Sequence, residues 1–189
     1  MSHPSDRARL LALLRSLSFE RRKVVLASGK ESDFYVDCKR TALTAEGHVL
    51  VGRLLWEETR RLRPAVRGVG GLTLGADPIA SAVALTSFLD PGADAPVDAF
   101  IVRKEPKGHG TGQWIEGRTT IPDGSRVVVL EDVVTTGGSA LKAIERCRAE
   151  RLLPVACLAL VDRLEGGREA IEAAGVPLTA LFTRRDFLP

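Results

Sequence analysis

Two acidic residues and a hydroxyl-rich glycine turn stand side by side in residues 126–140, RVVVLEDVVTTGGSA. An apolar run leads directly into Glu131 and Asp132, and the turn at residues 135–139 precedes a predicted helix. A turn with two glycines lets successive backbone N–H groups converge on one point, and the helix start adds the positive end of its dipole. Two carboxylates at a strand end can bind a vicinal diol. The segment therefore predicts a sugar-phosphate site, at the edge where open α/β sheets bind ligands.

A second segment, residues 102–117 (VRKEPKGHGTGQWIEG), places four candidate cations in a glycine-rich stretch: Arg103, Lys104, Lys107 and His109. A pyrophosphate leaving group gains negative charge as its C–O bond breaks. Mobile cations that close over it would stabilise that charge and exclude water. Taken alone, the stretch could equally be a solvated basic loop.

Two other phosphate-binding motifs are absent from the sequence. No G-x-x-x-x-G-K-[ST] run occurs, which excludes a P-loop nucleotide hydrolase. Gly68, Gly70 and Gly71 follow a predicted strand, but Thr73 stands where a dinucleotide-binding G-x-G-x-x-G motif needs its third glycine. The site at residues 131–139 is therefore the leading candidate.

The composition excludes several classes of protein. The 189-residue chain has 27 basic and 24 acidic residues, a formal net charge of +3, which does not indicate a nucleic-acid partner. Its length suits one domain over residues 1–189, and no apolar run reaches the roughly 20 residues that span a bilayer. Cys38, Cys147 and Cys157 form no C-x-x-C pair and fit a reducing compartment. We therefore expect a cytoplasmic protein with no membrane and no nucleic acid among its partners.

The hydrophobic pattern predicts the elements that hold these residues. Leucines at helical spacing predict a helix over residues 10–17, and Thr44 caps a second helix that ends near Leu62. Residues 78–89 are nearly all apolar, so we expect that helix to be buried. Strands and helices then alternate, which favours a parallel sheet with a central strand at 127–130 and a long loop at 104–122. The predicted strands cover 34–37, 66–69, 97–102, 126–130, 154–161 and 178–182, and the later helices 139–151 and 167–174.

Residues 126–140 closely resemble the phosphoribosyl-pyrophosphate (PRPP) motif of the type I phosphoribosyltransferases. In that family the acids bind the ribose hydroxyls and the following loop binds the 5′-phosphate. The motif alone does not choose the base that accepts the sugar, and it also occurs in regulators. The resemblance implies that PRPP is bound by Glu131, Asp132, Val133, Val134, Thr135, Thr136, Gly137, Gly138 and Ser139.

Other segments resemble the orotate phosphoribosyltransferases within this family. The pattern R-K-x-x-K-x-H-G resembles their flexible catalytic loop, which reaches the neighbouring subunit's active site and implies a catalytic role for Arg103, Lys104, Lys107 and His109. Residues 28–39 (SGKESDFYVDCK) and 160–167 (LVDRLEGG) resemble segments around the orotate pocket. An arginine fork matches a carboxylate, although Asp162 and Arg163 could also form a surface ion pair. The implied orotate-binding residues are Tyr35, Thr135 and Arg163.

The resemblance also implies a fold, an activity and a cofactor. The fold is α/β, the type I phosphoribosyltransferase fold, with a mostly parallel central sheet flanked by helices. It includes a small N-terminal hood over about residues 1–40 and a flexible loop over about 104–120. The activity is transfer of the phosphoribosyl group from PRPP to orotate, in pyrimidine biosynthesis. Mg²⁺ is expected to bind through PRPP, without direct protein ligands, and the active sites are expected to be shared in a homodimer.

Three departures from the family pattern bear on the site. Ala27 and Gly75 stand where some members have lysine, and Lys30 is a candidate substitute for the first. Glu131 begins the acidic pair where many members have aspartate. Two alternatives stay open: a PRPP-binding regulator without turnover, and a phosphoribosyltransferase for another base.

Overall fold

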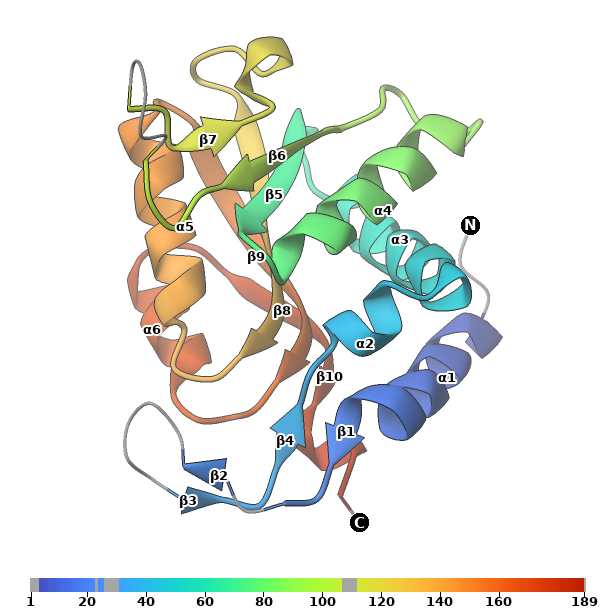
Figure 1. Cartoon of the computed structure of the whole chain (residues 1–189). Coiled ribbons are helices and arrows are strands. Elements are labelled where there is room, and N and C mark those ends of the chain that lie inside the picture. Colours follow the sequence, from blue (N-terminus) through green and yellow to red (C-terminus); the bar gives the residue numbers. More distant parts are fainter. Residues whose placement is uncertain (1–3, 23, 26–30, 107–111, 189) are drawn as a thin grey trace.

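The computed structural model describes residues 4–22, 24–25, 31–106 and 112–188. Its centre is a six-stranded sheet in the order β10-β9-β8-β5-β6-β7 (Figure 1). Every neighbouring pair is parallel except β6 and β7, which confirms the predicted mostly parallel sheet. The strands are β5 (Gly68–Leu72), β6 (Asp98–Val102), β7 (Ile115–Glu116), β8 (Arg126–Val134), β9 (Leu153–Asp162) and β10 (Leu178–Thr183).

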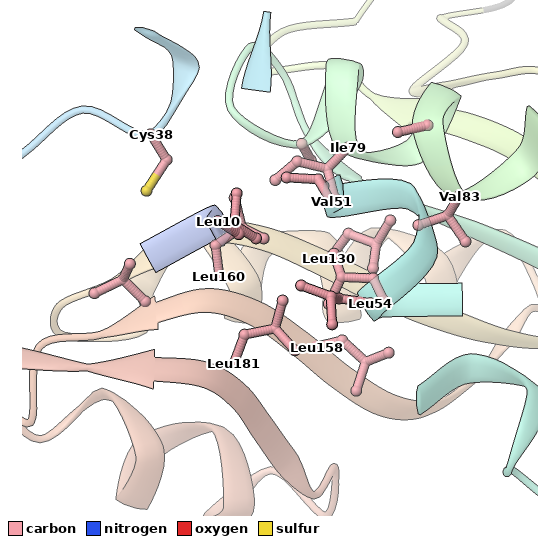
Figure 2. Packing of buried hydrophobic residues seen from close by; sticks show 14 of the residues in the cluster. Leu10, Cys38, Val51, Leu54, Ile79, Val83, Leu130, Leu158, Leu160 and Leu181 are labelled. Carbon is pink, nitrogen blue, oxygen red and sulfur yellow. The ribbon is translucent and has the colours of Figure 1, made fainter. Parts of the chain in front are cut away.

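Helices cover both faces of the sheet. α3 (Ala45–Arg60) and α4 (Ala76–Leu89) lie on one face, and α5 (Gly138–Ala149) and α6 (Gly167–Ala173) on the other (Figure 1). Alternate residues of β8 enter the two cores: Val128 and Leu130 join one, and Val127 and Val129 the other. Figure 2 shows Leu130 among leucines of β9 and aliphatic residues of α3 and α4. The predicted central strand is confirmed, because β8 is apolar on both faces and covered on both.

The N-terminal part of the chain packs against one end of this sheet. α1 (Pro4–Leu13) continues into a π-helical turn (Leu14–Ser18), and α2 (Lys39–Ala42) leads to α3. Two short antiparallel pairs join β1 (Phe19–Glu20) to β4 (Tyr35–Val36) and β2 (Val24–Val25) to β3 (Glu31–Ser32). The rings of Phe19, Phe34 and Phe187 lie 5.1–5.6 Å apart, so the C-terminal end of the chain is packed beside β1 and β4 (Figure 1).

The predicted cap of α3 is confirmed, and several predicted boundaries are not. The Thr44 hydroxyl accepts a hydrogen bond from the Gly47 N–H at 3.1 Å. Gly70 and Gly71 lie inside β5 rather than after it. A Cβ on either would lie 2.1 Å from a backbone oxygen of a neighbouring strand, so glycine permits the close approach. β7 was not predicted, because its two residues are too short to show a pattern.

The expectation that the 78–89 helix is buried holds for only one of its sides. Leu85, Phe88 and Leu89 of α4 are 54%, 74% and 67% exposed. The helix packs on α3 and the sheet through Ile79, Val83 and neighbouring alanines, and its other side is uncovered in the single chain. Composition around a helix does not reveal which faces have a neighbour. Over the described parts of the chain, no helix is long and apolar enough to cross a membrane.

Candidate active site

Both predicted acids lie within the last four residues of β8, not after its end. The strand continues to Val134, with Glu131 opposite Ala159 and Val134 opposite Asp162 of β9. Consecutive residues of a strand point to opposite faces. Glu131 and Asp132 therefore leave β8 in opposite directions at the carboxyl-terminal edge of the sheet, although their carboxyl groups still interact with each other.

The glycine turn between β8 and α5 surrounds a pocket of about 270 Å³. Gly137 has a φ of 82°, and a Cβ there would lie 2.9 Å from the backbone oxygen of Gly167, so only glycine fits without strain. α5 begins at the next residue and directs its N-terminal N–H groups toward the pocket. The pocket is lined by Glu131, Val133, Val134, Thr135, Thr136, Gly137, Gly138, Ser139 and Lys142.

Glu131 is the buried acid of the pair, with 5% of its surface exposed. Burial raises the pKa of its carboxyl group well above the ordinary value, and the negative charge of Asp132 raises it further. Both causes shift the protonation equilibrium of this group toward its neutral form. A neutral carboxyl group can donate one hydrogen bond as well as accept others, which suits a sugar hydroxyl.

Asp132 faces a different set of groups from the other side of β8. Its Oδ1 accepts a hydrogen bond from the Val133 N–H at 2.9 Å, and its Oδ2 lies 3.9 Å from the Lys39 Nζ. A Cβ on Gly75 would lie 2.4 Å from Asp132 Oδ1. The glycine that departs from the family pattern thus lets the loop after β5 approach this carboxylate closely.

Arg163 follows the end of β9 and is buried, with 7% of its surface exposed. Its backbone N–H donates to the Val134 oxygen at 2.9 Å, so it lies beside the end of β8. The guanidinium Nε and Nη2 lie 3.2 and 3.0 Å from Glu165 Oε1. Asp162 is fully buried and lies 3.2 Å from the guanidinium of Arg168. The surface ion pair between Asp162 and Arg163 that the sequence left open is therefore not formed.

The aromatic residue that the structure places against Arg163 is Phe34, whose ring centre lies 5.5 Å from the guanidinium carbon. Tyr35 is the next residue and the first of β4. Its ring lies 4.0 Å from the guanidinium carbon of Arg22. Arg163 and Thr135 thus lie at the ends of neighbouring strands, whereas Tyr35 comes from the N-terminal part of the chain.

The predicted catalytic loop is described only at its two ends. Arg103 follows β6 and lies 3.1 Å from the Glu116 carboxylate of β7, and Lys104 is exposed. Lys107 and His109 lie outside the described residues, as do Ala27 and Lys30. Beyond the loop, the Trp114 ring lies 3.5 Å from the guanidinium carbon of Arg146 in α5. The base of the loop is therefore attached to the helix that begins at the glycine turn.

The described residues can be tested for a metal site by their donor chemistry. No group of three or more His, Cys, Asp or Glu side chains among them could hold an ion. Glu131 and Asp132 do supply carboxylate oxygens near the pocket, and Mg²⁺ prefers one or two carboxylates together with substrate phosphate oxygens. The residues present therefore fit a magnesium ion that arrives bound to a phosphorylated substrate.

Comparison with known proteins identifies the family. Residues 69–174, more than half of the chain, match the family model of the phosphoribosyl transferase domain. An orotate phosphoribosyltransferase of Sorangium cellulosum is 55% identical over 98% of this chain and 94% of its own length. The chain belongs to the orotate phosphoribosyltransferases. A second member, from Aquifex aeolicus, is 50% identical over 86% of this chain and 85% of its own length.

Solved orotate phosphoribosyltransferases share the fold described above. The Mycobacterium tuberculosis enzyme in complex with Fe(III) dicitrate is 41% identical, with a TM-score of 0.81 over 97% of this chain and 99% of its own. The same enzyme in complex with PRPP is 41% identical, with a TM-score of 0.77 over 96% of this chain and 98% of its own. The resemblance stated from the sequence is thereby confirmed, as is the type I phosphoribosyltransferase fold.

Two lysines near this site were not singled out from the sequence. Lys142 lines the pocket one turn into α5. Its position four residues after Gly138 is the sequence feature that could have identified it. Lys39 lies 2.7 Å from Asp37 and close to Asp132, and the hydrogen bond with Asp37 raises its pKa. Lys39 ends the segment 28–39 that resembles a segment around the orotate pocket, but its approach to β8 depends on the packing of α2.

Proposed function

We propose that this protein transfers the phosphoribosyl group of PRPP to orotate, giving orotidine 5′-monophosphate and pyrophosphate. The observation that carries the proposal is the pocket of residues 131–142, in a chain that belongs to the orotate phosphoribosyltransferases. The bond from ribose C1 to the pyrophosphate oxygen breaks, and a bond from C1 to the orotate nitrogen forms. That nitrogen gives up its proton, which passes to the departing pyrophosphate or to solvent.

The protein's part in this reaction is to bind, orient and stabilise charge. Backbone N–H groups and hydroxyls of residues 135–139 hold the 5′-phosphate, with Lys142 as an additional cation. Glu131 and Asp132 bind the ribose hydroxyls from the two sides of β8. Held in this way, the C1 carbon is presented to the base at a fixed position, which removes most of the entropic cost of the encounter.

The second requirement is to stabilise the negative charge that develops on the leaving group. Mg²⁺ would be held mainly by the oxygens of PRPP beside Glu131 and Asp132, and its charge would make the departure of pyrophosphate easier. We assign the same task to Arg103, Lys104, Lys107 and His109 in a flexible loop over about residues 104–120. Closure of such a loop also excludes water, which would otherwise hydrolyse PRPP.

Orotate is held by Tyr35, Thr135 and Arg163, beneath a hood formed by about residues 1–40. The guanidinium of Arg163 is a match for the carboxylate that distinguishes orotate from uracil. Its position beside the end of β8 supports this assignment, because the base must reach the ribose held there.

A homodimer with shared active sites completes the proposal. The exposed apolar residues Leu85, Phe88 and Leu89 of α4, and Leu74 before it, offer a surface that a second copy would bury. Sedimentation equilibrium would test the dimer. We also expect a cytoplasmic location, because all three cysteines are buried as free thiols, and imaging of a fluorescent fusion would test it.

An ultraviolet assay tests the activity directly. Purified protein, PRPP and Mg²⁺ are incubated with orotate, and parallel reactions contain uracil, adenine, hypoxanthine or xanthine. We expect magnesium-dependent consumption of orotate alone. Consumption of a different base would overturn the orotate assignment and keep the PRPP site. PRPP binding without turnover of any base would instead favour a regulator.

A further inference from the structure

Four charged side chains of alternating sign form a row that joins three segments far apart in the sequence. Asp33 precedes β4, Arg163 and Glu165 follow β9, and Arg184 follows β10. Arg184 Nη2 lies 2.5 Å from Asp33 Oδ1, and Arg184 Nη1 lies 3.7 Å from Glu165 Oε1. The same Glu165 oxygen lies 3.0 Å from Arg163 Nη2. The row thus runs Asp33, Arg184, Glu165, Arg163.

The two arginines also share one aromatic ring. The guanidinium carbons of Arg163 and Arg184 lie 5.5 and 5.6 Å from the centre of the fully buried Phe34 ring. Two like charges this close to one side chain repel each other, and Glu165 is the anion that touches both. The ring supplies a rigid surface, and Glu165 sets how the two guanidinium groups are arranged on it.

Glu165 fixes the orientation of the Arg163 guanidinium. Both Nε and Nη2 of Arg163 lie within 3.2 Å of Glu165 Oε1, so a single oxygen engages one edge of the planar group. A carboxylate ligand that binds Arg163 adds a second anion close to Glu165. The charge of Glu165 must then be offset by another cation, and Arg184 is the guanidinium placed to do so.

Arg184 is itself held in position from two directions. Asp33 binds it from the N-terminal part of the chain. It begins a 3₁₀ turn, Arg184–Asp186, in which the Asp186 carboxylate accepts hydrogen bonds from the Thr183 N–H at 2.7 Å and the Thr183 hydroxyl at 3.0 Å. The neighbouring Arg185 is exposed and takes no part in the row.

We propose that Arg184 is a positioning residue for the carboxylate-bearing base: through Glu165 it sets the orientation and charge balance of Arg163. This inference rests on the proposed function, in which Arg163 binds the orotate carboxylate. It adds that the chain's C-terminal turn and the N-terminal Asp33 together determine how well the site accepts an anionic base. The PRPP half of the site lies outside the row and is not affected.

The test compares Arg184→Ala with Arg185→Ala, adjacent arginines of which only the first belongs to the row. We expect Arg184→Ala to raise KM for orotate about tenfold and to leave KM for PRPP within about twofold of the wild-type value. Misplacing a binding group weakens the binding only of the ligand that this group contacts. Arg184→Lys should recover part of the loss, since it restores the charge and not the fork. Arg185→Ala should match the wild type in both constants.

A double-mutant cycle separates positioning from a merely structural role. If Arg184 acts through Glu165, the effects of Arg184→Ala and Glu165→Gln on KM for orotate will not multiply. Asp33→Asn serves as a second variant if Arg184→Ala does not fold, because it removes only the outer anion. It should also raise KM for orotate, but by less than Arg184→Ala does.

The outcomes distinguish this inference from the proposed function. A wild-type protein that does not consume orotate overturns the proposed function, and the inference with it. Arg163→Ala with an unchanged KM for orotate overturns the role of Arg163 and therefore that of Arg184. If Arg163→Ala raises KM for orotate and both Arg184→Ala and Asp33→Asn behave like Arg185→Ala, the function stands and the inference is wrong.

Discussion

The two halves of the candidate site are built in different ways. The phosphate half comes from one continuous segment, residues 131–142, in which a strand, a glycine turn and a helix follow one another. The half assigned to the base draws on residues 33–35, 163–165 and 184, which only packing brings together. A phosphate is bound mostly by backbone N–H groups, which a local turn can supply. A planar base with a carboxylate needs side chains from several directions.

The difference predicts how substitutions will act. Changes in the continuous segment should affect PRPP alone, except at Thr135, which we also assign to orotate. Changes in the assembled half should affect orotate alone. The residues that we assign to the leaving group, between β6 and β7, belong to neither half, and their substitution should affect the chemical step. The first two predictions below test this division, and the third tests the environment of the buried acid in the phosphate half. They run from the largest expected effect to the smallest.

Lys104→Ala should lower kcat by about 10²- to 10³-fold, the usual effect of removing one group that stabilises charge in the transition state. The dissociation constant for PRPP should change only a few-fold, because the charge of Lys104 matters most as pyrophosphate leaves. Steady-state kinetics and calorimetric titration with PRPP measure the two quantities. Equal losses in turnover and binding, or no loss in either, would count against the loop's separate role.

Gly137→Ala should raise KM for PRPP about tenfold and leave KM for orotate unchanged. An L-residue in the left-handed region costs about 1–2 kcal/mol, and its Cβ would crowd the Gly167 backbone. Gly124→Ala is the matched control, because Gly124 has a φ of 76° and no atom within 4 Å of its Cβ position. It should lower thermal stability and leave both constants as in the wild type. A Gly137 variant that raised KM for orotate as much as KM for PRPP would show that the two halves are not independent.

Glu131→Gln should make the protein more stable at neutral pH. The pKa of the Glu131 carboxyl is raised mainly by burial and next by the charge of Asp132. Folding therefore favours the protonated form. This contribution is fully present below the ordinary pKa of 4.5 and is lost as pH rises through the pKa in the folded protein.

Glutamine keeps the neutral form at every pH. The variant should therefore melt a few degrees above the wild type at pH 7–8, and the difference should shrink toward pH 4. Thermal melts across that range provide the measurement. A difference that does not change with pH would mean that Glu131 is not held neutral by its surroundings.

The phosphate half was largely predictable from the sequence. Residues 131–139 were identified from an apolar run, two acids and a glycine turn, and the structure places eight of the nine around one pocket. The exception is Asp132, which faces Gly75 and Lys39 from the other side of β8. The sequence placed both acids after the strand, because charged residues are uncommon in a buried strand. The strand's true end at Val134 depends on its pairing with β9.

The base half could be predicted only in part. Arg163 was identified through a family resemblance, but its partners Glu165 and Phe34 were not. The helix at 76–89 shows the same limit, since its apolar residues were expected to be buried and Phe88 is exposed. Whether an apolar side chain is covered depends on what packs against it, and the pattern along one helix does not contain that information.

The sequence by itself determined the order of the longer strands and helices, the central place of β8 and the glycine turn. These features depend on periodicity and on backbone geometry between near neighbours in the chain. Only the tertiary structure decided that Glu131 is buried while Asp132 meets Lys39, and that Arg184 reaches Glu165 and Asp33. Contacts of this kind join residues up to 151 positions apart, and the packing of the whole chain sets their distances and their dielectric surroundings.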